Sequence, residues 1–476
     1  MLCSRKIKKK RRVDMNDFGL LTLLPICIVI IISLKTKKTM LALLLGTVVS
    51  YLIVSGKDFA SSWTDAMYRA ACDKEHMWVF LVCGLFGSLI TLIGASHGTL
   101  AFAKWLEKHC KNARTTLLTT WILGILIFID DYLNILTLST CMKRVADKRK
   151  IPREALAYVI DSTGAPVCVL LPFSTWAIFF ASLFYQEQGV AALGYGNALQ
   201  TYLHVIPYIF YALVAVVLVP LFILNLVPKL GNMKKAYARV EKTGRVYNES
   251  DDILNTEDLK QEEEENNLSS KDENLLDFLI PIGSLIVVTL ISKELLYAII
   301  FSILICLAMY LPRKKMDFNR FCDLCMHGFC NMIPTLGIIF AAFIMQQAMS
   351  DIGIANFIIR TVTPFLSAGI FPVVTFLATA ALTFSTGSSW GIPAICIPIL
   401  MPLGFSLGAD PLLVMAAIVS GATLGSHACF YSDATVLTSS CCKIENMEHA
   451  ISQLPYAAAA ASIGAGGYLL FGMMLA

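Results

Sequence analysis

Charged residues are scarce in this chain. Asp, Glu, Lys and Arg together make up only 15% of its 476 residues, whereas they make up about 25% of a typical soluble protein. Hydrophobic residues account for 57% of the sequence, and the mean hydropathy is +0.68. This balance excludes an ordinary soluble globular protein and indicates a chain that lies largely within a lipid bilayer.

Several motifs of enzymes are also missing. The sequence has no HExxH zinc motif and no GxxxxGK[ST] phosphate loop, which argues against a metalloprotease and against ATP-driven transport by this chain. It also lacks the Gly-x-Gly-Asp segment of intramembrane aspartyl proteases, so that enzyme class is a less favoured alternative. Most of the cysteines lie within apolar runs, as is typical of small buried residues that stay reduced. We therefore expect no enzymatic activity and no cofactor.

Apolar runs recur along nearly the whole chain. Together they predict an all-α, polytopic membrane protein with two structurally repeated halves and about 10–13 transmembrane or re-entrant segments, some broken at mid-membrane. The strands of a membrane barrel would instead alternate in short segments. The expected location is the cell membrane, crossed many times, with the lipid bilayer as a partner and no nucleic acid. A homodimer is compatible with these features.

Two hydrophilic segments divide the chain. A run of Lys and Arg spans residues 5–12, and a central segment begins basic and ends with glutamates at 262–265. Basic segments favour the cytoplasmic side of a membrane, so we predict that the N-terminus and the central linker are cytoplasmic. The predicted divisions are a basic tail (1–16), an N-terminal transmembrane repeat (17–228), a solvated hydrophilic linker (229–276) and a C-terminal transmembrane repeat (277–476).

The two halves resemble each other at a spacing of roughly 255–260 residues. In this register residues 130–131 fall opposite 389–390, and Ser174 falls opposite Asp433. Duplicated halves with broken helices are the plan of many secondary transporters. An inverted repeat needs an odd number of crossings in each half, whereas a cytoplasmic tail and linker imply an even number. A half-length re-entrant segment would reconcile the two, so the orientation of the repeat stays open.

Acidic residues interrupt the apolar runs at four positions: Asp130, Asp131, Asp161 and Asp433. A carboxylate at the centre of a bilayer costs at least about 2.5 kcal/mol, so such residues face a protein interior or a wet cavity and mark ion or proton pathways. This pattern is typical of a transporter.

The first polar cluster spans residues 128–140. At helical spacing Asp130, Asn134 and Thr137 share one face, as do Asp131 and Asn134. Two adjacent carboxylates repel each other when both are ionised, and such a pair suits the carriage of a proton or of a cation exchanged for it. The structural alternative is a helix cap or an ion pair with a nearby cation, namely Lys143, Arg144 or Arg153.

The second cluster is Asp161-Ser162-Thr163, followed by Gly164 and Pro166. Glycine and proline interrupt a helix and leave backbone carbonyls unpaired. Carboxylate, hydroxyl and carbonyl oxygens are the ligands of hard cations. We therefore predict a Na⁺ site made by Asp161, Ser162, Thr163 and Asp433. The alternative is a capped helix start or a proline kink without a ligand.

Two further clusters lie in the second half. Residues 383–393 are rich in hydroxyls and bounded by glycine and proline, which is typical of an unwound segment that could hold a cation or an anion, or that packs helices tightly. His427 precedes Asp433 in the last cluster and could carry protons or make a single structural hydrogen bond. The predicted substrate-coordinating or cation-coordinating residues are Ser385, Thr386, Ser388, Ser389, Ser174 and His427.

These segments together resemble the NhaC family of sodium/proton antiporters. The similarity is carried by residues 129–134, 153–163, 166–168 and 172–176 in the first half and by 384–391 and 452–457 in the second. One departure stands out: the family usually has Gly-Asp-His where this chain has Gly-Ser426-His. A missing carboxylate puts ion stoichiometry and sodium coupling in question.

The resemblance implies a secondary antiporter that exchanges Na⁺ and H⁺ by alternating access. The four aspartates would carry the exchangeable charge, and hydroxyls would supply neutral oxygens. Because family members also couple such ions to small carboxylates, exchange of malate-type or lactate-type anions, or of amino acids, is the alternative. The expected partners are Na⁺, H⁺ and, under that alternative, a small carboxylate.

Overall fold

The computed structural model describes residues 18–36, 38–172, 174–256, 274–292, 294–354, 357 and 366–475. Helices occupy most of these ranges, and no strand occurs in them. The prediction of an all-α protein is thus confirmed. The basic tail and the glutamate run of the linker lie outside the described residues, so their predicted cytoplasmic location stays a prediction.

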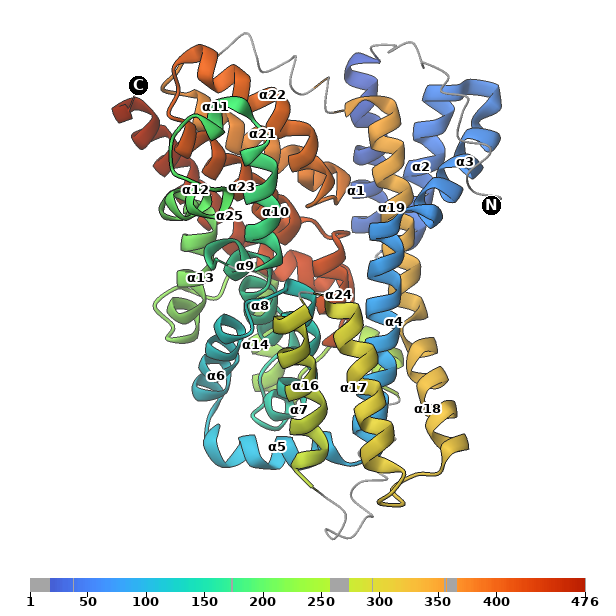
Figure 1. The fold of residues 1–476 in the computed structure, drawn as a ribbon. Coiled ribbons are helices and arrows are strands. Elements are labelled where there is room, and N and C mark those ends of the chain that lie inside the picture. Colours follow the sequence, from blue (N-terminus) through green and yellow to red (C-terminus); the bar gives the residue numbers. More distant parts are fainter. Residues whose placement is uncertain are drawn as a thin grey trace.

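The helices form two bundles that stand side by side (Figure 1). The first bundle pairs helices from the beginning of each half, with α4 packed on α18 and α2 packed on α19. Its helices are α1 (Leu24–Thr36), α2 (Thr39–Ser55), α3 (Phe59–Cys72), α4 (Lys74–Ala95), α16 (Leu276–Ser292), α17 (Leu295–Tyr310), α18 (Phe318–Asn331) and α19 (Ile333–Ile352).

The second bundle contains the later helices of both halves, and α5 (Gly98–His109) joins the two bundles at the lower end of Figure 1. From the first half it takes α6 (Ala113–Leu126), α7 (Asp131–Lys148), α8 (Arg153–Thr163), α9 (Ala165–Leu170), α10 (Thr175–Tyr185), α11 (Gln188–Ala191), α12 (Ala198–Val205) and α13 (Phe210–Ile223). From the second half it takes α21 (Phe371–Thr386), α22 (Gly391–Leu407), α23 (Pro411–Ala428), α24 (Asp433–Cys441) and α25 (Asn446–Leu475).

Helix breaks recur at matching places in the two halves of the second bundle. Ser174 caps the start of α10, and its hydroxyl donates to the Cys168 carbonyl at 2.6 Å. Ser432 caps the start of α24, and its hydroxyl donates to the Ser426 carbonyl at the same distance. Both pairs of positions are 258 residues apart. Ser174 therefore corresponds to Ser432, one residue before the Asp433 that the sequence comparison had placed opposite it, because the helix caps fix a register that apolar matches leave loose.

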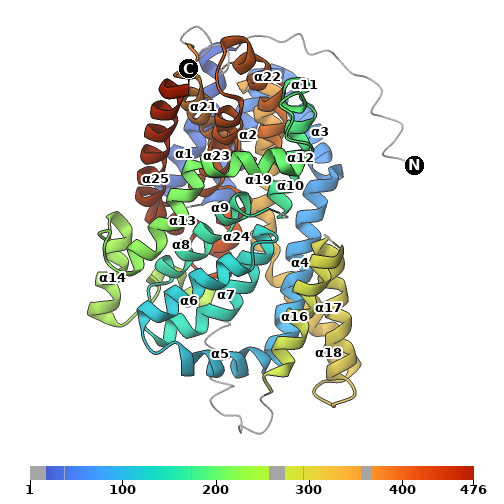
Figure 2. The same cartoon turned by 60° about the vertical axis from the view of Figure 1, so that its left-hand side comes forward.

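The two halves run in opposite directions. In both views α8, α9 and α10 rise through the molecule, whereas α23 descends from the upper part to α24 (Figures 1 and 2). The hairpin of α6 and α7 lies in the lower half, and the hairpin of α21 and α22 lies at the top. This arrangement is an inverted repeat, with one hairpin at each end of the molecule.

The described helices differ in whether they are long and apolar enough to cross a membrane. Four helical stretches are long and apolar enough to cross a bilayer, or up to seven if each of three bent helix pairs counts as one span. Six shorter apolar helices, of 10–17 residues, accompany them. Long, broken and short apolar helices together agree with the predicted polytopic protein with re-entrant segments.

The first part of the linker is folded rather than freely solvated. The guanidinium of Arg239, on α14 (Gly231–Thr243), donates to both carboxylate oxygens of Glu154 at 2.8 and 2.9 Å. Asp251 accepts a hydrogen bond of 3.1 Å from the Glu445 amide, next to the start of α25. Because Glu154 lies in the first turn of α8, the linker holds the lower ends of two helices of the second bundle.

The free cysteines of the described chain agree with a reduced protein. Cys322 and Cys325 form a CxxC pair one turn apart on α18, and both are free. No group of metal ligands is found among the described residues.

We predict that the crossing of α4 and α18 requires glycine. A methyl group added at Gly328 of α18 would lie 2.5 Å from the carbonyl oxygen of Gly87 on α4. A methyl group added at Gly94, which lies on α4 like Gly87, meets nothing within 4 Å. Gly328→Ala should destabilise the protein by about 1–3 kcal/mol through overpacking, and Gly94→Ala should not. Thermal unfolding of the two variants in detergent measures the difference, and equal midpoints would contradict this packing.

A second prediction concerns the pH dependence of linker docking. Burial, followed by the charge of Glu448, raises the pKa of Asp251 to about 7. The folded carboxyl then holds its proton more tightly than the unfolded one, whose pKa is about 3.9. Its contribution to stability is therefore fully present below about pH 4 and is lost as pH rises through about 7.

Hydrogen exchange of residues 249–256, corrected for the intrinsic rate, should be faster at pH 8 than at pH 5.5. Asp251→Asn should remove the difference. Asp252→Asn, at a half-exposed neighbouring carboxylate that pairs with Arg245, should keep it. A wild-type protection that does not change with pH would disprove this role for Asp251.

Candidate functional site

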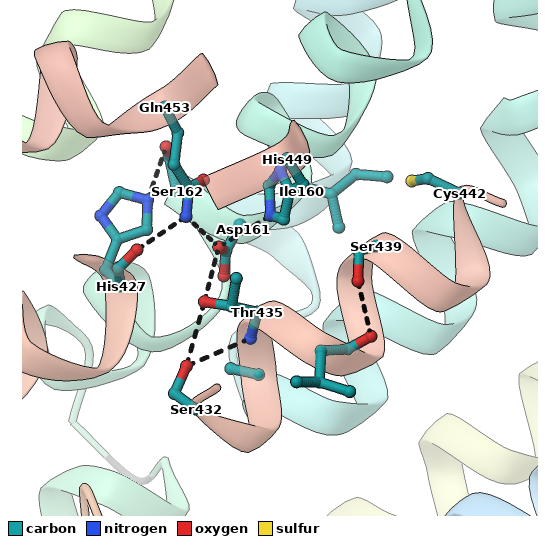
Figure 3. A network of polar contacts seen from close by, with 12 residues as sticks. Ile160, Asp161, Ser162, His427, Ser432, Thr435, Ser439, Cys442, His449 and Gln453 are labelled. Atoms are coloured by element: carbon teal, nitrogen blue, oxygen red, sulfur yellow. Dashed lines mark hydrogen bonds and ion pairs between the residues drawn. The ribbon is translucent and has the colours of Figure 1, made fainter. Parts of the chain in front are cut away.

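Asp161 lies at the centre of a buried polar network in the second bundle (Figure 3). It belongs to the last turn of α8, just before the break at Gly164, and is 2% exposed. Its Oδ2 atom accepts a hydrogen bond of 2.7 Å from the Gln453 amide and lies 3.1 Å from the His449 ring nitrogen Nε2. The Thr435 hydroxyl is a more distant donor at 3.5 Å. Both halves of the chain thus meet at one carboxylate.

Helix α25 supplies two of these contacts because of its spacing. His449 and Gln453 are four residues apart and therefore lie on one face of the helix. The Gln453 amide also donates to the His427 carbonyl at 2.7 Å, which ties α25 to the end of α23. One glutamine side chain thus holds Asp161 and the neighbouring helix end together.

His427 extends the network away from Asp161. One ring nitrogen lies 3.2 Å from the Ser162 hydroxyl, and the other lies 2.7 Å from the Tyr211 hydroxyl of α13. Each nitrogen of the imidazole therefore faces a group that can both donate and accept. His427 thus makes two hydrogen bonds, one more than the structural alternative assumed.

Several buried polar atoms near Asp161 have no hydrogen-bond partner. They include Gln453 Oε1, Ser426 Oγ and His449 Nδ1. Buried polar groups are nearly always satisfied, so unsatisfied ones indicate a place for water or an ion. The serine that replaces the usual family aspartate is one of them.

A second acidic centre lies at the seam between the bundles. The Tyr132 hydroxyl of α7 donates to Asp433 Oδ2 at the start of α24. The ring of Trp78, from α4 in the first bundle, meets the Tyr132 ring edge-on with centroids 5.7 Å apart. Asp433 therefore faces the first bundle, whereas Asp161 lies inside the second.

The adjacent residues Asp130 and Asp131 have different environments. Asp130 caps α7 by accepting from the Leu133 amide at 3.1 Å, and it also accepts from the Thr175 hydroxyl at 3.1 Å. Asp131 is 2% exposed, and its Oδ1 atom is buried without a partner. The structural alternative of a helix cap is thus correct for Asp130, and Asp131 remains the candidate ion ligand of the pair.

The neighbouring Asn134 and Thr137 are buried on the same helix. The Asn134 amide donates to the carbonyls of Gly124 and Ile127 at 2.6 and 3.1 Å, so this side chain ties α6 to α7. Asn134 Oδ1 and Thr137 Oγ1 have no partner.

The hydroxyls of the break before α22 serve mainly local structure. Ser388 accepts from the Gly391 amide at 3.0 Å and from the Gln346 amide at 2.6 Å. The Thr386 hydroxyl donates to the Leu382 carbonyl. Ser389 Oγ and, in the last turn of α21, Thr383 Oγ1 are buried without a partner, so these two hydroxyls are available to a ligand. Ser385 is partly buried, and its carbonyl accepts from Tyr431.

The predicted Na⁺ ligands do not form one set. Asp161 and Asp433 have separate partners in separate centres. The Thr163 hydroxyl donates to the Val159 and Ile160 carbonyls at 3.0 Å, and its side chain packs against Gly124. Ser174 is likewise a helix cap. Asp161 and Ser162 stay together in one network, and α24 joins it through Thr435.

No lysine or arginine among the described residues forms an ion pair with any of the four aspartates. The carboxylate charge must therefore be balanced by hydrogen-bond donors, by a proton or by a cation. Such a site can exchange a proton for a metal cation.

Sequence reasoning missed His449, Tyr211 and Tyr132 as contacts of the two acidic centres. The one available signal was the spacing of His449 and Gln453 on an apolar helix. Tyrosines at helical spacing are common in membrane helices, so Tyr211 and Tyr132 gave no distinct signal.

Comparison with known proteins agrees with this geometry. Residues 198–473, more than half of the chain, match the Na⁺/H⁺ antiporter family. The chain is 25% identical over 498 residues to an uncharacterized protein of Haemophilus influenzae, covering 97% of this chain and 92% of that protein. A stretch of 128 residues is 28% identical to the malate-2H(+)/Na(+)-lactate antiporter of Bacillus subtilis, covering 27% of each chain.

A stretch of 147 residues is 26% identical to the arginine/ornithine antiporter ArcD of Halobacterium salinarum, covering 30% of each chain. These shorter matches support a secondary transporter, and the long family match agrees with the resemblance found in the sequence. The chain belongs to the Na⁺/H⁺ antiporter family.

Proposed function

We propose that this protein is a secondary active transporter that exchanges Na⁺ for H⁺ across the cell membrane by alternating access. The observation that carries this proposal is the buried carboxylate of Asp161, which belongs to the first half and is held by neutral or titratable side chains of the second half. A carboxylate in this setting can be neutralised by either transported ion. Binding either ion neither forms nor breaks a covalent bond of the protein other than that to the proton.

In this proposal a proton and Na⁺ compete for Asp161, and this competition couples their movements. A proton shared between Asp161 and His449 neutralises the carboxylate in one state. Na⁺ replaces it in the other state, with oxygen ligands from Asp161, Ser162 and Thr435 and from the Gln453 carbonyl after the amide turns. Because one carboxylate serves both ions, binding of one releases the other.

Movement between the bundles gives access from alternate sides. Both acidic centres belong to the second bundle, and the Asp433–Tyr132 contact lies where it faces α4. Because each half of the chain contributes helices to both bundles, the moving unit in this proposal is a bundle. In this scheme the side of the second bundle at which the linker contacts α8 and α25 faces the cytoplasm.

Exchange of a small organic anion or an amino acid is the second candidate function. It is favoured by the partial similarity to antiporters of malate and lactate and of arginine and ornithine. The neutral hydroxyl-rich break that holds Ser388 and Ser389 would then contact the organic substrate.

Replacing the central carboxylate should abolish exchange. In everted vesicles that hold an imposed pH gradient, added Na⁺ should collapse the gradient for the wild type but not for Asp161→Asn, which cannot be neutralised by either ion. Asp410→Asn is the matched control, because asparagine also caps a helix and Asp410 only caps α23. Full activity of Asp161→Asn at wild-type expression would remove Asp161 from the mechanism. A response to malate but not to Na⁺ would favour the second candidate.

Removing the donor to Asp433 should change ion affinity more than maximal rate. Tyr132→Phe deletes only the hydroxyl, and loss of such a supporting contact costs about 10-fold in metal affinity. Tyr297→Phe, at an exposed tyrosine of α17, is the control. The half-saturating Na⁺ concentration of exchange in proteoliposomes measures the effect, and identical values for all three proteins would place Asp433 outside the ion path.

A further inference from the structure

A chain of contacts crosses the seam between the two bundles and ends at Asp433. Glu294 immediately precedes α17 in the first bundle, and its Oε1 atom accepts a hydrogen bond of 2.5 Å from the indole nitrogen of Trp78 on α4. The Trp78 ring meets the Tyr132 ring of α7 edge-on, and the Tyr132 hydroxyl donates to Asp433. Two side chains of the first bundle thus reach an acidic centre of the second bundle through one tyrosine.

The position of Glu294 is fixed by the start of its helix. Its Oε1 atom also accepts from the Leu296 amide at 3.3 Å, and a carboxylate is stabilised at a helix N-terminus. Helix α17 packs on α4 (Figures 1 and 2). No lysine or arginine of the described chain forms an ion pair with Glu294. The Trp78 indole is therefore the side-chain donor that ties this carboxylate to α4.

The bond to Glu294 fixes how Trp78 presents its ring to Tyr132. An indole has a single N–H donor, so a bond from that donor to a held carboxylate sets the rotation of the ring. Aromatic pairs favour edge-to-face contact with centroids about 4.5–7 Å apart, and here the rings lie 5.7 Å apart at 80°. Glu294 also acts electrostatically on Asp130, so its charge reaches the second bundle as well.

We propose that Glu294 and Trp78 are positioning residues of the first bundle, which hold Tyr132 in place to support cation binding at Asp433. This relay of four residues is complete only when the bundles meet as they do in this structure, because each bundle supplies two members. Asp433 then binds a cation more tightly in this arrangement than in one where the bundles have shifted, since contacts that orient a ligand raise metal affinity.

The relay couples cation binding to the movement of the bundles. A ligand stabilises the arrangement that binds it more tightly. A cation at Asp433 therefore favours the arrangement in which the relay is complete, and its release favours the other. This coupling rests on the alternating access proposed above, and it adds the residues through which the first bundle senses the ion.

Na⁺ binding to the purified protein tests the relay separately from exchange. Thermal unfolding in detergent is followed over a series of Na⁺ concentrations at constant ionic strength set with choline chloride, and the rise of the midpoint gives the apparent Kd. Trp78→Phe keeps a ring against Tyr132 but removes the bond to Glu294, and it should weaken Na⁺ binding about 10-fold. Trp63→Phe is the matched control, because the Trp63 indole donates to the Thr47 hydroxyl at 2.9 Å within the first bundle.

A double-mutant cycle separates a relay from two independent contacts. If Trp78 acts through Tyr132, Trp78→Phe combined with Tyr132→Phe should weaken Na⁺ binding about as much as Tyr132→Phe alone, because effects that share one contact do not add. Multiplication of the two single effects would overturn the relay.

Replacing the carboxylate gives a graded test. Glu294→Gln keeps the acceptor oxygen but makes the bond neutral, and it should weaken Na⁺ binding about 3-fold, because charge-assisted hydrogen bonds are about twice as strong as neutral ones. Asp317→Asn is the control, at an exposed carboxylate that caps α18 by accepting from the Arg320 amide at 3.0 Å.

The outcomes distinguish the relay from the exchange mechanism. Wild-type affinity in both Trp78→Phe and Glu294→Gln, or an equal loss in their controls, would overturn the relay. A wild-type protein that Na⁺ does not stabilise would overturn it too. A wild-type protein that binds Na⁺ but does not exchange it for protons in vesicles contradicts the proposed function alone, and a 10-fold loss of binding in Trp78→Phe would then still support the relay.

Discussion

A carboxylate buried among apolar helices is the constraint on which this structure depends. Asp161 is almost fully removed from solvent, and no arginine or lysine of the described chain pairs with it. Leaving such a charge without partners would cost several kcal/mol. The structure brings donors to it from a helix almost 300 positions away in the sequence: His449 and Gln453. Each donor fixes the position of α25 against α8, so the requirement of one side chain sets the packing of two helices.

The helix breaks follow from the same constraint. Ions need polar atoms at mid-membrane, and a continuous helix hides its backbone groups in its own hydrogen bonds. Breaking a helix exposes amides that must be capped. The chain solves this twice in the same way, with Ser174 in one half and Ser432 in the other. Part of the conspicuous polar sequence therefore serves to close helix ends, and the atoms left over, such as Asp131 Oδ1 and Ser389 Oγ, are the ones available to ligands.

The sequence was sufficient to predict the helical class, the repeat and the helix breaks, because apolar runs and Gly-Pro interruptions are local signals. The sequence was insufficient to predict contacts between residues that lie far apart along the chain. Asp161 and Asp433 looked like ligands of one ion, yet Asp161 bonds to Gln453 of α25 and Asp433 bonds to Tyr132 of α7. Packing decides these partners. Thr163 was indistinguishable from a ligand until its hydroxyl was seen to bond within its own helix. The linker looked solvated because the pairing of Arg239 with Glu154 joins segments 85 residues apart.

The interleaving of the two halves has a consequence for biogenesis. Helices α2 and α4 pack most extensively against α19 and α18, which leave the ribosome more than 200 residues later. Until then lipid or an insertion factor must cover the glycine-rich face of α4, which α18 later approaches closely at Gly328. The first bundle therefore stays incomplete until α19 has been synthesised, although its sequence begins the chain.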